Sequence, residues 1–153
     1  MKKQKLYPMI IVDGMCGVVK STTTRKLSRQ FTYHSLPHRW LHEDVNRHPI
    51  RHHEFEIDDC MTKEGMDINV KDMINRWQGL ADLAVAFGGT YIIEGCFIHA
   101  IDRHFAGSAY NVEQTFDYFD NVSKILAKTG ALFIYLRSPN VKLTLENAFN
   151  TRG

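Results

Sequence analysis

A glycine-containing segment near the amino terminus, residues 13–22, has the spacing of a loop that binds phosphate. Gly14, Lys20 and Ser21 stand at three positions of the motif G-x-x-x-x-G-K-[ST]. In that motif backbone N–H groups and a helix N-terminus face the phosphate oxygens, the lysine contacts the β- and γ-phosphates, and the hydroxyl ligates Mg²⁺. Val19 stands where the motif has its second glycine. The segment predicts phosphate binding, with one departure beside the lysine.

The valine at position 19 bears directly on that chemistry. A glycine there lets the backbone come close to phosphate and take dihedral angles that a β-branched residue resists. We therefore expect nucleotide binding to be weakened or abolished.

The composition and net charge limit which classes of protein this chain can belong to. The 153 residues fit one domain with a sizeable core, and 44% hydrophobic and 24% charged residues are ordinary for a globular protein. A net charge of +2 gives no basic surface for nucleic acid or a membrane, and no apolar run is long enough to span a bilayer. The three cysteines have no ligand-like spacing, so reduced thiols in a cytoplasmic protein are expected.

Strand and helix patterns alternate along the chain. Four short segments predict strands, the apolar runs at residues 8–12, 90–93 and 131–136 and the more polar segment 39–43. Four other segments predict helices, at residues 20 to about 30, 69–87, 111–128 and from 138 onward. The polar, histidine-rich segment 44–67 predicts a loop with at most a short helix. Strands alternating with long helices indicate an α/β protein with an open parallel sheet.

Residues with known capping preferences mark several helix ends. Asn69 is expected to begin the 69–87 helix, and Gly88 to end it. Asn111 with Gln114 resembles a capping box, and Gly130 is expected to end that helix.

Polar residues follow the predicted strands at their carboxyl ends, where parallel α/β sheets bind ligands. These residues are Asp13, Glu43, Glu94 and Arg137. We expect them to gather at one edge of the sheet, near the glycine loop. Asp13 is expected to hydrogen-bond loop amides, which is a structural role. His42, His99 and His104 could line a cleft for the acceptor, but the sequence itself does not show this.

Three further stretches occur in a consistent order after the loop: residues 40–44 with His48-Pro49, residues 91–98, and residues 135–141 with Arg152-Gly153. With them the chain resembles the nucleoside- and nucleotide-kinase branch of the P-loop fold, which includes thymidylate kinases and deoxynucleoside kinases. It is more similar still to a group of bacterial P-loop proteins of kinase type. The resemblance implies one three-layer P-loop domain over residues 1–153, with four strands here and the usual fifth strand and lid missing.

The resemblance also implies a site. ATP and Mg²⁺ would bind at the loop, through Gly14, Met15, Cys16, Gly17, Val18, Val19, Lys20, Ser21 and Thr22. Ser21 and Glu94 would hold the metal, and Lys20 would act on the transferred phosphoryl group. Glu43 would be the base or the acceptor-orienting carboxylate, with Asp44 as the neighbouring alternative, and Arg76 would hold a small-molecule acceptor.

Each of these assignments has a plainer alternative. Glu43 could be a surface carboxylate, and a solvated helix face is slightly favoured for Arg76. His48, His52 and His53 lie near acidic residues at positions 54, 56, 58 and 59, but their spacing matches no metal-ligand pattern, so a solvated loop is expected. For the whole chain the alternative to a phosphotransferase is a non-catalytic P-loop domain, which Val19 and the missing lid favour.

Overall fold

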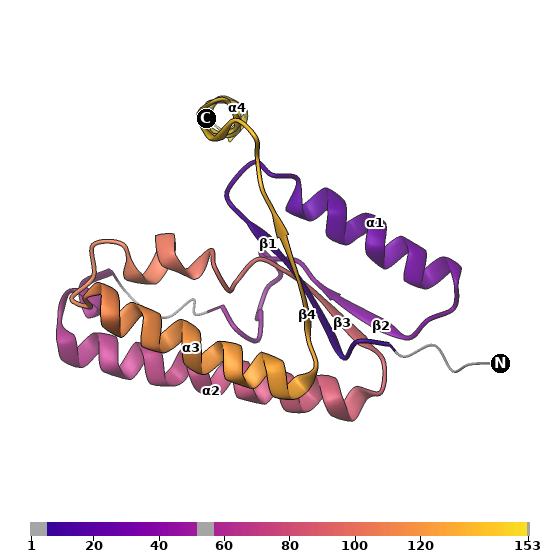
Figure 1. The fold of residues 1–153 in the computed structure, drawn as a ribbon, viewed down its shortest axis with the longest axis horizontal. Coiled ribbons are helices and arrows are strands. Elements are labelled where there is room, and N and C mark those ends of the chain that lie inside the picture. Colours follow the sequence, from indigo (N-terminus) through magenta and orange to yellow (C-terminus); the bar gives the residue numbers. More distant parts are fainter. Residues whose placement is uncertain (1–5, 52–56, 153) are drawn as a thin grey trace.

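Four parallel strands form the centre of this computed structural model, which describes residues 6–51 and 57–152 (Figure 1). The strands are β1 (Met9–Gly14), β2 (His38–Leu41), β3 (Thr90–Glu94) and β4 (Leu132–Leu136), in the spatial order β2-β3-β1-β4. All neighbouring pairs are parallel, with Ile10 of β1 opposite both Ile92 and Leu132. The predicted α/β fold with a four-stranded parallel sheet is confirmed.

Helices cover both faces of this sheet. The helices on the faces are α1 (Lys20–Tyr33), α2 (Lys63–Phe87) and α3 (Val112–Thr129), and a further helix, α4 (Val141–Arg152), follows β4. Two short helical turns, η1 (Ile57–Met61) and η2 (Ile101–Phe105), precede α2 and α3 respectively. Figure 1 shows α1 on one side of the sheet and α2 with α3 on the other. None of the helices within the described ranges is long and apolar enough to cross a membrane.

The side chains of β1 alternate between two hydrophobic cores, as the period of a strand requires. Met9 and Ile11 pack in the core beneath α2 and α3, whereas Ile10 and Val12 pack in the core beneath α1. All four are buried. A strand buried on both faces needs a continuous apolar run, which explains the sequence of β1.

The core under α2 and α3 contains a hydrogen-bonded aromatic pair. Trp77 of α2 is completely buried, and its Nε1–H donates to Tyr118 Oη of α3 at 3.1 Å. Burial raises the pKa of the Tyr118 phenol above its ordinary value, so the hydroxyl stays protonated. Phe97 meets Trp77 and Phe119 edge-on, at centroid distances of 6.0 and 5.3 Å.

The predicted start of α2 at Asn69 is wrong. The helix begins at Lys63, where the Thr62 side chain accepts a hydrogen bond from the Gly65 backbone N–H at 3.1 Å. Asn69 is instead buried inside the helix. Only Met66 faces the core in the first turn, so the apolar period is too weak there to show the helix in the sequence.

Other predicted helix ends agree with the structure. The capping box of Asn111 with Gln114 is present at the start of α3, and Gly88 and Gly130 adopt left-handed conformations after α2 and α3. The last helix starts at Val141, a little later than predicted, because the Asn140 side chain accepts from the Leu143 N–H and so caps it.

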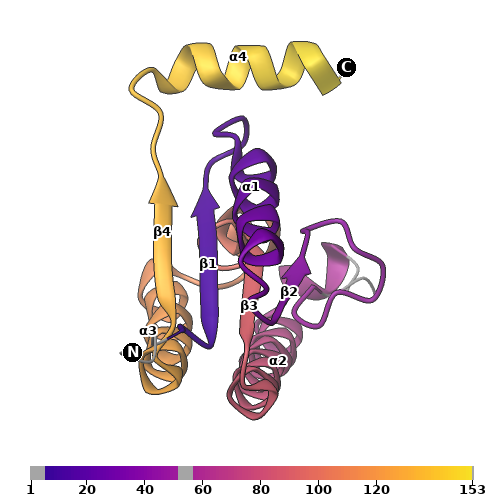
Figure 2. The same cartoon turned by 90° about the vertical axis from the view of Figure 1, so that its right-hand side faces the viewer.

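The chain leaves β1 and β3 towards opposite faces of the sheet, through α1 and α3 respectively. The carboxyl ends of these adjacent strands therefore flank a switch point, where open α/β sheets form a ligand-binding crevice. Figure 2 shows α4 lying across the same end of the sheet.

We predict that replacing Tyr118 by Phe lowers the free energy of unfolding by about 1–3 kcal/mol, because it leaves the buried Trp77 N–H without its acceptor. Chemical denaturation measures the change. Tyr33→Phe is the control, since Tyr33 is 81% exposed, and should change stability by less than about 0.5 kcal/mol. Equal values for the two variants would contradict the prediction.

Candidate functional site

The carboxylate of Asp13, at the end of β1, joins two loops at the carboxyl edge of the sheet. It is completely buried. Its Oδ1 accepts from the Gly14 N–H at 2.6 Å, and its Oδ2 accepts from the N–H groups of Phe97 at 3.1 Å and Ile98 at 2.7 Å. The predicted contact of Asp13 with loop amides is confirmed. The loop after β1 and the turn after β3 are therefore fixed to one another.

Positive φ angles occur at Gly14 (149°), the last residue of β1, and at Gly17 (81°) and Val19 (57°) in the loop that follows. A Cβ on Gly14 would lie 2.4 Å from the Leu136 carbonyl oxygen, so only glycine fits there. Val19 adopts the left-handed conformation despite its branched side chain, which is 64% exposed. The loop thus takes a glycine-like path at Val19 and carries the strain of a β-branched residue in that conformation.

The loop presents unpaired backbone donors. The N–H groups of Met15, Cys16, Gly17 and Val18 make no hydrogen bond to any part of the chain that the structure describes. Helix α1 begins directly after this loop, and the N–H groups of Lys20, Ser21 and Thr22 have no partner within the helix, whereas the Thr23 N–H donates to the Val19 carbonyl oxygen at 3.0 Å. Such an array of donors at the positive end of a helix attracts anions.

Lys20, the first residue of α1, folds back over the loop. Its side chain is buried, and Nζ donates to the carbonyl oxygens of Gly14 at 2.9 Å and Met15 at 3.0 Å. The positive charge is therefore held at the loop and does not extend into solvent.

Glu94 ends β3 and is 1% exposed. Ser21 Oγ donates to its Oε1, and Thr24 Oγ1 donates to its Oε2 at 3.3 Å. These contacts bring the predicted metal ligands Ser21 and Glu94 side by side, although they are 73 residues apart in the chain.

His42 also approaches Glu94, with Nε2 3.5 Å from Oε2. The Asp44 N–H donates to Nδ1 of the same ring at 3.0 Å. Because Nδ1 accepts that bond, the neutral ring carries its proton on Nε2, which faces the buried carboxylate. The predicted strand 39–43 is wrong at its end, because β2 ends at Leu41. His42 and Glu43 therefore lie in the loop that follows the strand.

A cavity of about 230 Å³ opens over the loop, far more than one water molecule requires. It is lined by Gly17, Val18, Val19, Lys20, Ser21, Thr22, Glu43 and Glu94. Most of the residues predicted for the site therefore surround one space. Gly14 is buried, and Gly14, Met15 and Cys16 are not among the described residues that line the cavity.

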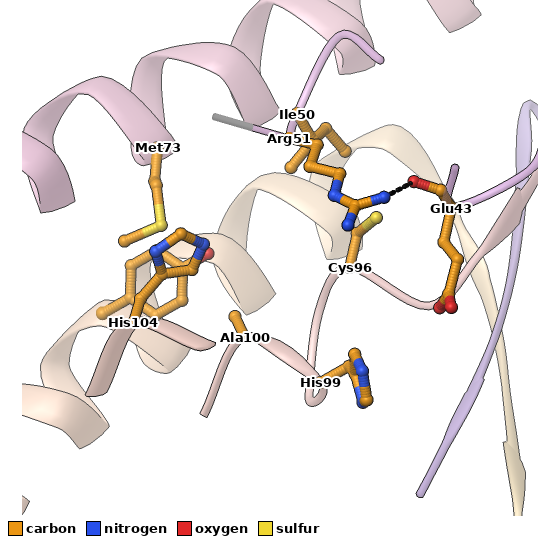
Figure 3. Close-up of a pocket in the computed structure, with 9 residues that line it drawn as sticks. Glu43, Ile50, Arg51, Met73, Cys96, His99, Ala100 and His104 are labelled. Atoms are coloured by element: carbon orange, nitrogen blue, oxygen red, sulfur yellow. Dashed lines mark hydrogen bonds between the residues drawn. The ribbon is translucent and has the colours of Figure 1, made fainter. Parts of the chain in front are cut away.

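A second, smaller cavity of about 30 Å³ lies beside the first (Figure 3). It is lined by Glu43, Ile50, Arg51, Met73, Cys96, His99, Ala100, His104 and Tyr118. Glu43 lines both cavities and stands between them. Arg51 could not be found from the sequence, because it reaches the site from the aperiodic loop that follows β2.

One oxygen of the Glu43 carboxylate is buried without a partner: Oε2 has no hydrogen-bond partner among residues 6–51 and 57–152. The Arg51 guanidinium donates to the backbone carbonyl oxygen of Glu43, as Figure 3 shows. It also donates to Asp44 Oδ1 at 2.7 Å. Gly95 has a φ of +63°, and a Cβ there would lie 3.3 Å from Glu43 Oε2, so glycine gives this carboxylate its space.

Arg76 lies apart from both cavities. It forms an ion pair with Asp72 one turn earlier on α2, and it is not among the described residues that line either cavity. Its role as an acceptor ligand stays a prediction. In the histidine-rich segment, residues 52–56 lie outside the described residues, whereas His48 is buried with Nδ1 accepting from the Ile50 N–H at 3.2 Å.

Comparison with known proteins adds no family to this description. No model of a protein family matches the chain, and no curated protein matches it significantly. The fold and the site themselves define the class: an α/β protein with a glycine-containing loop at its switch point, where a lysine, a serine and two carboxylates surround one cavity.

We predict that Asp13→Ala lowers the free energy of unfolding by about 3 kcal/mol, because three backbone N–H groups lose a charged acceptor. Urea denaturation measures the loss. Asp117→Ala, at an exposed position of α3, should change stability by less than about 0.5 kcal/mol. A loss below about 1 kcal/mol for the Asp13 variant would refute the structural role.

We predict that Val19→Gly raises the free energy of unfolding by about 1 kcal/mol, because glycine adopts the left-handed conformation without strain. Val85 offers a matched control, since it is similarly exposed at 60% but lies inside α2. There the same change should cost a few tenths of a kcal/mol, roughly the difference in helix propensity. A loss of stability at position 19 would show that the valine is not strained.

Proposed function

We propose that this chain binds ATP at the loop of residues 14–22 and transfers the γ-phosphoryl group to a nucleoside- or nucleotide-like acceptor. One observation carries the proposal. The loop, Lys20, Ser21, Glu43 and Glu94 meet around a single cavity at the carboxyl ends of β1 and β3. This is the position where parallel α/β sheets bind ligands, and the residue types are those that phosphoryl transfer requires.

The donors of the loop support phosphate binding. The unpaired N–H groups of residues 15–18 and the first turn of α1 would face the phosphate oxygens. Lys20 Nζ would exchange its contacts with the Gly14 and Met15 carbonyl oxygens for contacts with phosphate oxygens. Since its charge is already held at the loop, little reorganisation is needed.

The Ser21 hydroxyl and the Glu94 carboxylate fit a magnesium ion, because both are oxygen ligands and they lie in contact at the edge of the cavity. When bound, Mg²⁺ would neutralise negative charge on the phosphates. His42 and Thr24 contact the second oxygen of Glu94 and would keep the carboxylate oriented.

The buried, unpartnered Oε2 of Glu43 supports an acceptor site. A carboxylate oxygen without a donor is costly to bury, so it favours a ligand hydroxyl that donates to it. Glu43 would orient that hydroxyl, or take its proton, between the loop cavity and the second cavity. At about 30 Å³ the second cavity holds about two water molecules, so a nucleoside-sized acceptor requires its lining side chains to move.

A non-catalytic P-loop domain is the second candidate function. Val19 favours it, because this residue lines the loop cavity with a branched side chain and holds a strained backbone conformation. In that case the fold is kept while the affinity for nucleotide is lost.

The experiment is a calorimetric titration of the chain with Mg-ATP, beside Val19→Gly and Lys20→Ala. We expect the parent to bind, Val19→Gly to bind at least as tightly, and Lys20→Ala to bind about 10–100-fold more weakly through the loss of a charged hydrogen bond. Lys26→Ala, at an exposed site on the same helix, should bind as the parent does. Binding by Val19→Gly alone would support the second candidate, and binding by neither would refute nucleotide binding.

Catalysis is tested in the same series by following ADP release with a panel of nucleosides and nucleotides. Glu43→Gln should lower kcat about 10²–10⁴-fold and leave Mg-ATP affinity unchanged. Glu113→Gln, on the exposed first turn of α3, is the matched control. If the chain binds Mg-ATP but no compound in the panel leads to ADP release, the tested nucleosides and nucleotides are excluded as acceptors.

A further inference from the structure

The hydroxyl of Tyr118 accepts one hydrogen bond and donates none to the described part of the chain. Tyr118 is 1% exposed, and its Oη accepts from the Trp77 Nε1–H at 3.1 Å. Within residues 6–51 and 57–152, no acceptor receives the Tyr118 O–H itself. Because burial raises the pKa of this phenol, the hydroxyl keeps its proton and stays a donor at neutral pH. A buried donor without an acceptor is costly, so this O–H indicates a site for water or a ligand.

The space beside this hydroxyl is the second cavity, because Tyr118 is one of the residues that line it. Figure 3 shows Met73 and His104 across this cavity from Glu43. Trp77 lies one turn after Met73 on α2, so its N–H holds the Tyr118 hydroxyl at the Met73 end. The cavity therefore has an unpaired acceptor, Glu43 Oε2, at one end and an unpaired donor, the Tyr118 O–H, at the other.

The wall between these two groups is partly apolar. Ile50, Met73 and Ala100 line the cavity and are all buried. An apolar wall with a few fixed polar groups is typical of a site for a small organic molecule. A ligand that fits donates from a hydroxyl at the Glu43 end, is apolar in the middle, and carries a hydrogen-bond acceptor at the Tyr118 end.

We propose that the Tyr118 O–H recognises the base of the acceptor, donating to a carbonyl oxygen or an unprotonated ring nitrogen, while Glu43 receives a hydroxyl of its sugar. This inference rests on the acceptor site of the proposed function, and it makes Tyr118 a residue that determines specificity. A base that presents a donor at this point leaves the Tyr118 O–H unpaired and is rejected. Without ligand, the two water molecules that the cavity holds satisfy both groups.

The first test is a calorimetric titration of the full chain with nucleosides and nucleoside 5′-monophosphates, without ATP. We expect at least one of these compounds to bind, and Tyr118→Phe to bind it about 5–10-fold more weakly. Trp77→Phe is the matched control, because it removes the same Trp77–Tyr118 hydrogen bond but leaves the Tyr118 O–H in place. Its affinity for the compound should stay within about twofold of the parent's.

Three outcomes would overturn the proposal. Equal weakening in both variants would show that Tyr118 acts only through the packing of the core. Unchanged affinity in Tyr118→Phe would leave water as the only partner of the hydroxyl, and the third outcome is that no compound of the panel binds. The titration requires neither Mg-ATP nor ADP release, so its result is separate from that of the proposed phosphoryl transfer. Mg-ATP affinity, measured in the same variants, should not change.

The second test uses the unsubstituted chain and does not depend on how well either variant folds. Tyrosine labelled with ¹³C at the ring carbon that bears the hydroxyl reports hydrogen bonding of that hydroxyl by NMR. The compound that binds most tightly in the titration should shift the Tyr118 signal. It should leave the signal of Tyr33, which is 81% exposed, unchanged. An unchanged Tyr118 signal at saturation would overturn the proposal.

Discussion

The buried carboxylate of Asp13 is the constraint on which the site depends. It accepts hydrogen bonds from the turn after β1 and from the turn after β3, and so ties together the two chain segments that flank the switch point. Each bond joins a charged acceptor to a backbone donor in a place that water does not reach, where such bonds are strongest. The glycine-containing loop after β1 and the turn that follows Glu94 are thus held to one another by a single side chain near the end of the first strand.

Residues with unusual backbone conformations lie in the two turns that the Asp13 hydrogen bonds connect. Val19, Gly95 and Cys96 all have positive φ angles, and two of them are not glycine. Left-handed conformations in residues with a side chain cost energy and persist only where the surroundings hold them. Here the surroundings are the two fixed turns. The strain is therefore located beside the cavity, where it shapes the loop and makes room for Glu43.

Much of the fold follows from local patterns in the chain. The apolar runs of β1, β3 and β4 and the periodic faces of α2 and α3 predicted their elements, and the capping residues predicted several ends correctly. The failures have local reasons too. The first turn of α2 has a single core-facing residue, so its pattern is too weak to place the helix start. Arg51 reaches Glu43 from a loop without period, so this contact has no signal in the sequence. The predicted strand 39–43 extends two residues beyond the end of β2, and His42 meets Glu94 from the loop that follows this strand.

The sequence by itself determined the alternation of strands and helices, the loop at residues 14–22 and the polar residues at the strand ends, because these depend on period, spacing and turn chemistry within short windows. Only the tertiary structure decided that Glu43 stands between two cavities and that Arg76, paired with Asp72, is not among the described residues that line them. It also decided the conformation of Val19. The sequence shows that Val19 departs from the motif, but it does not show the conformation of this residue. The Val19 backbone is left-handed because the loop is held at one end by Asp13 and at the other by α1.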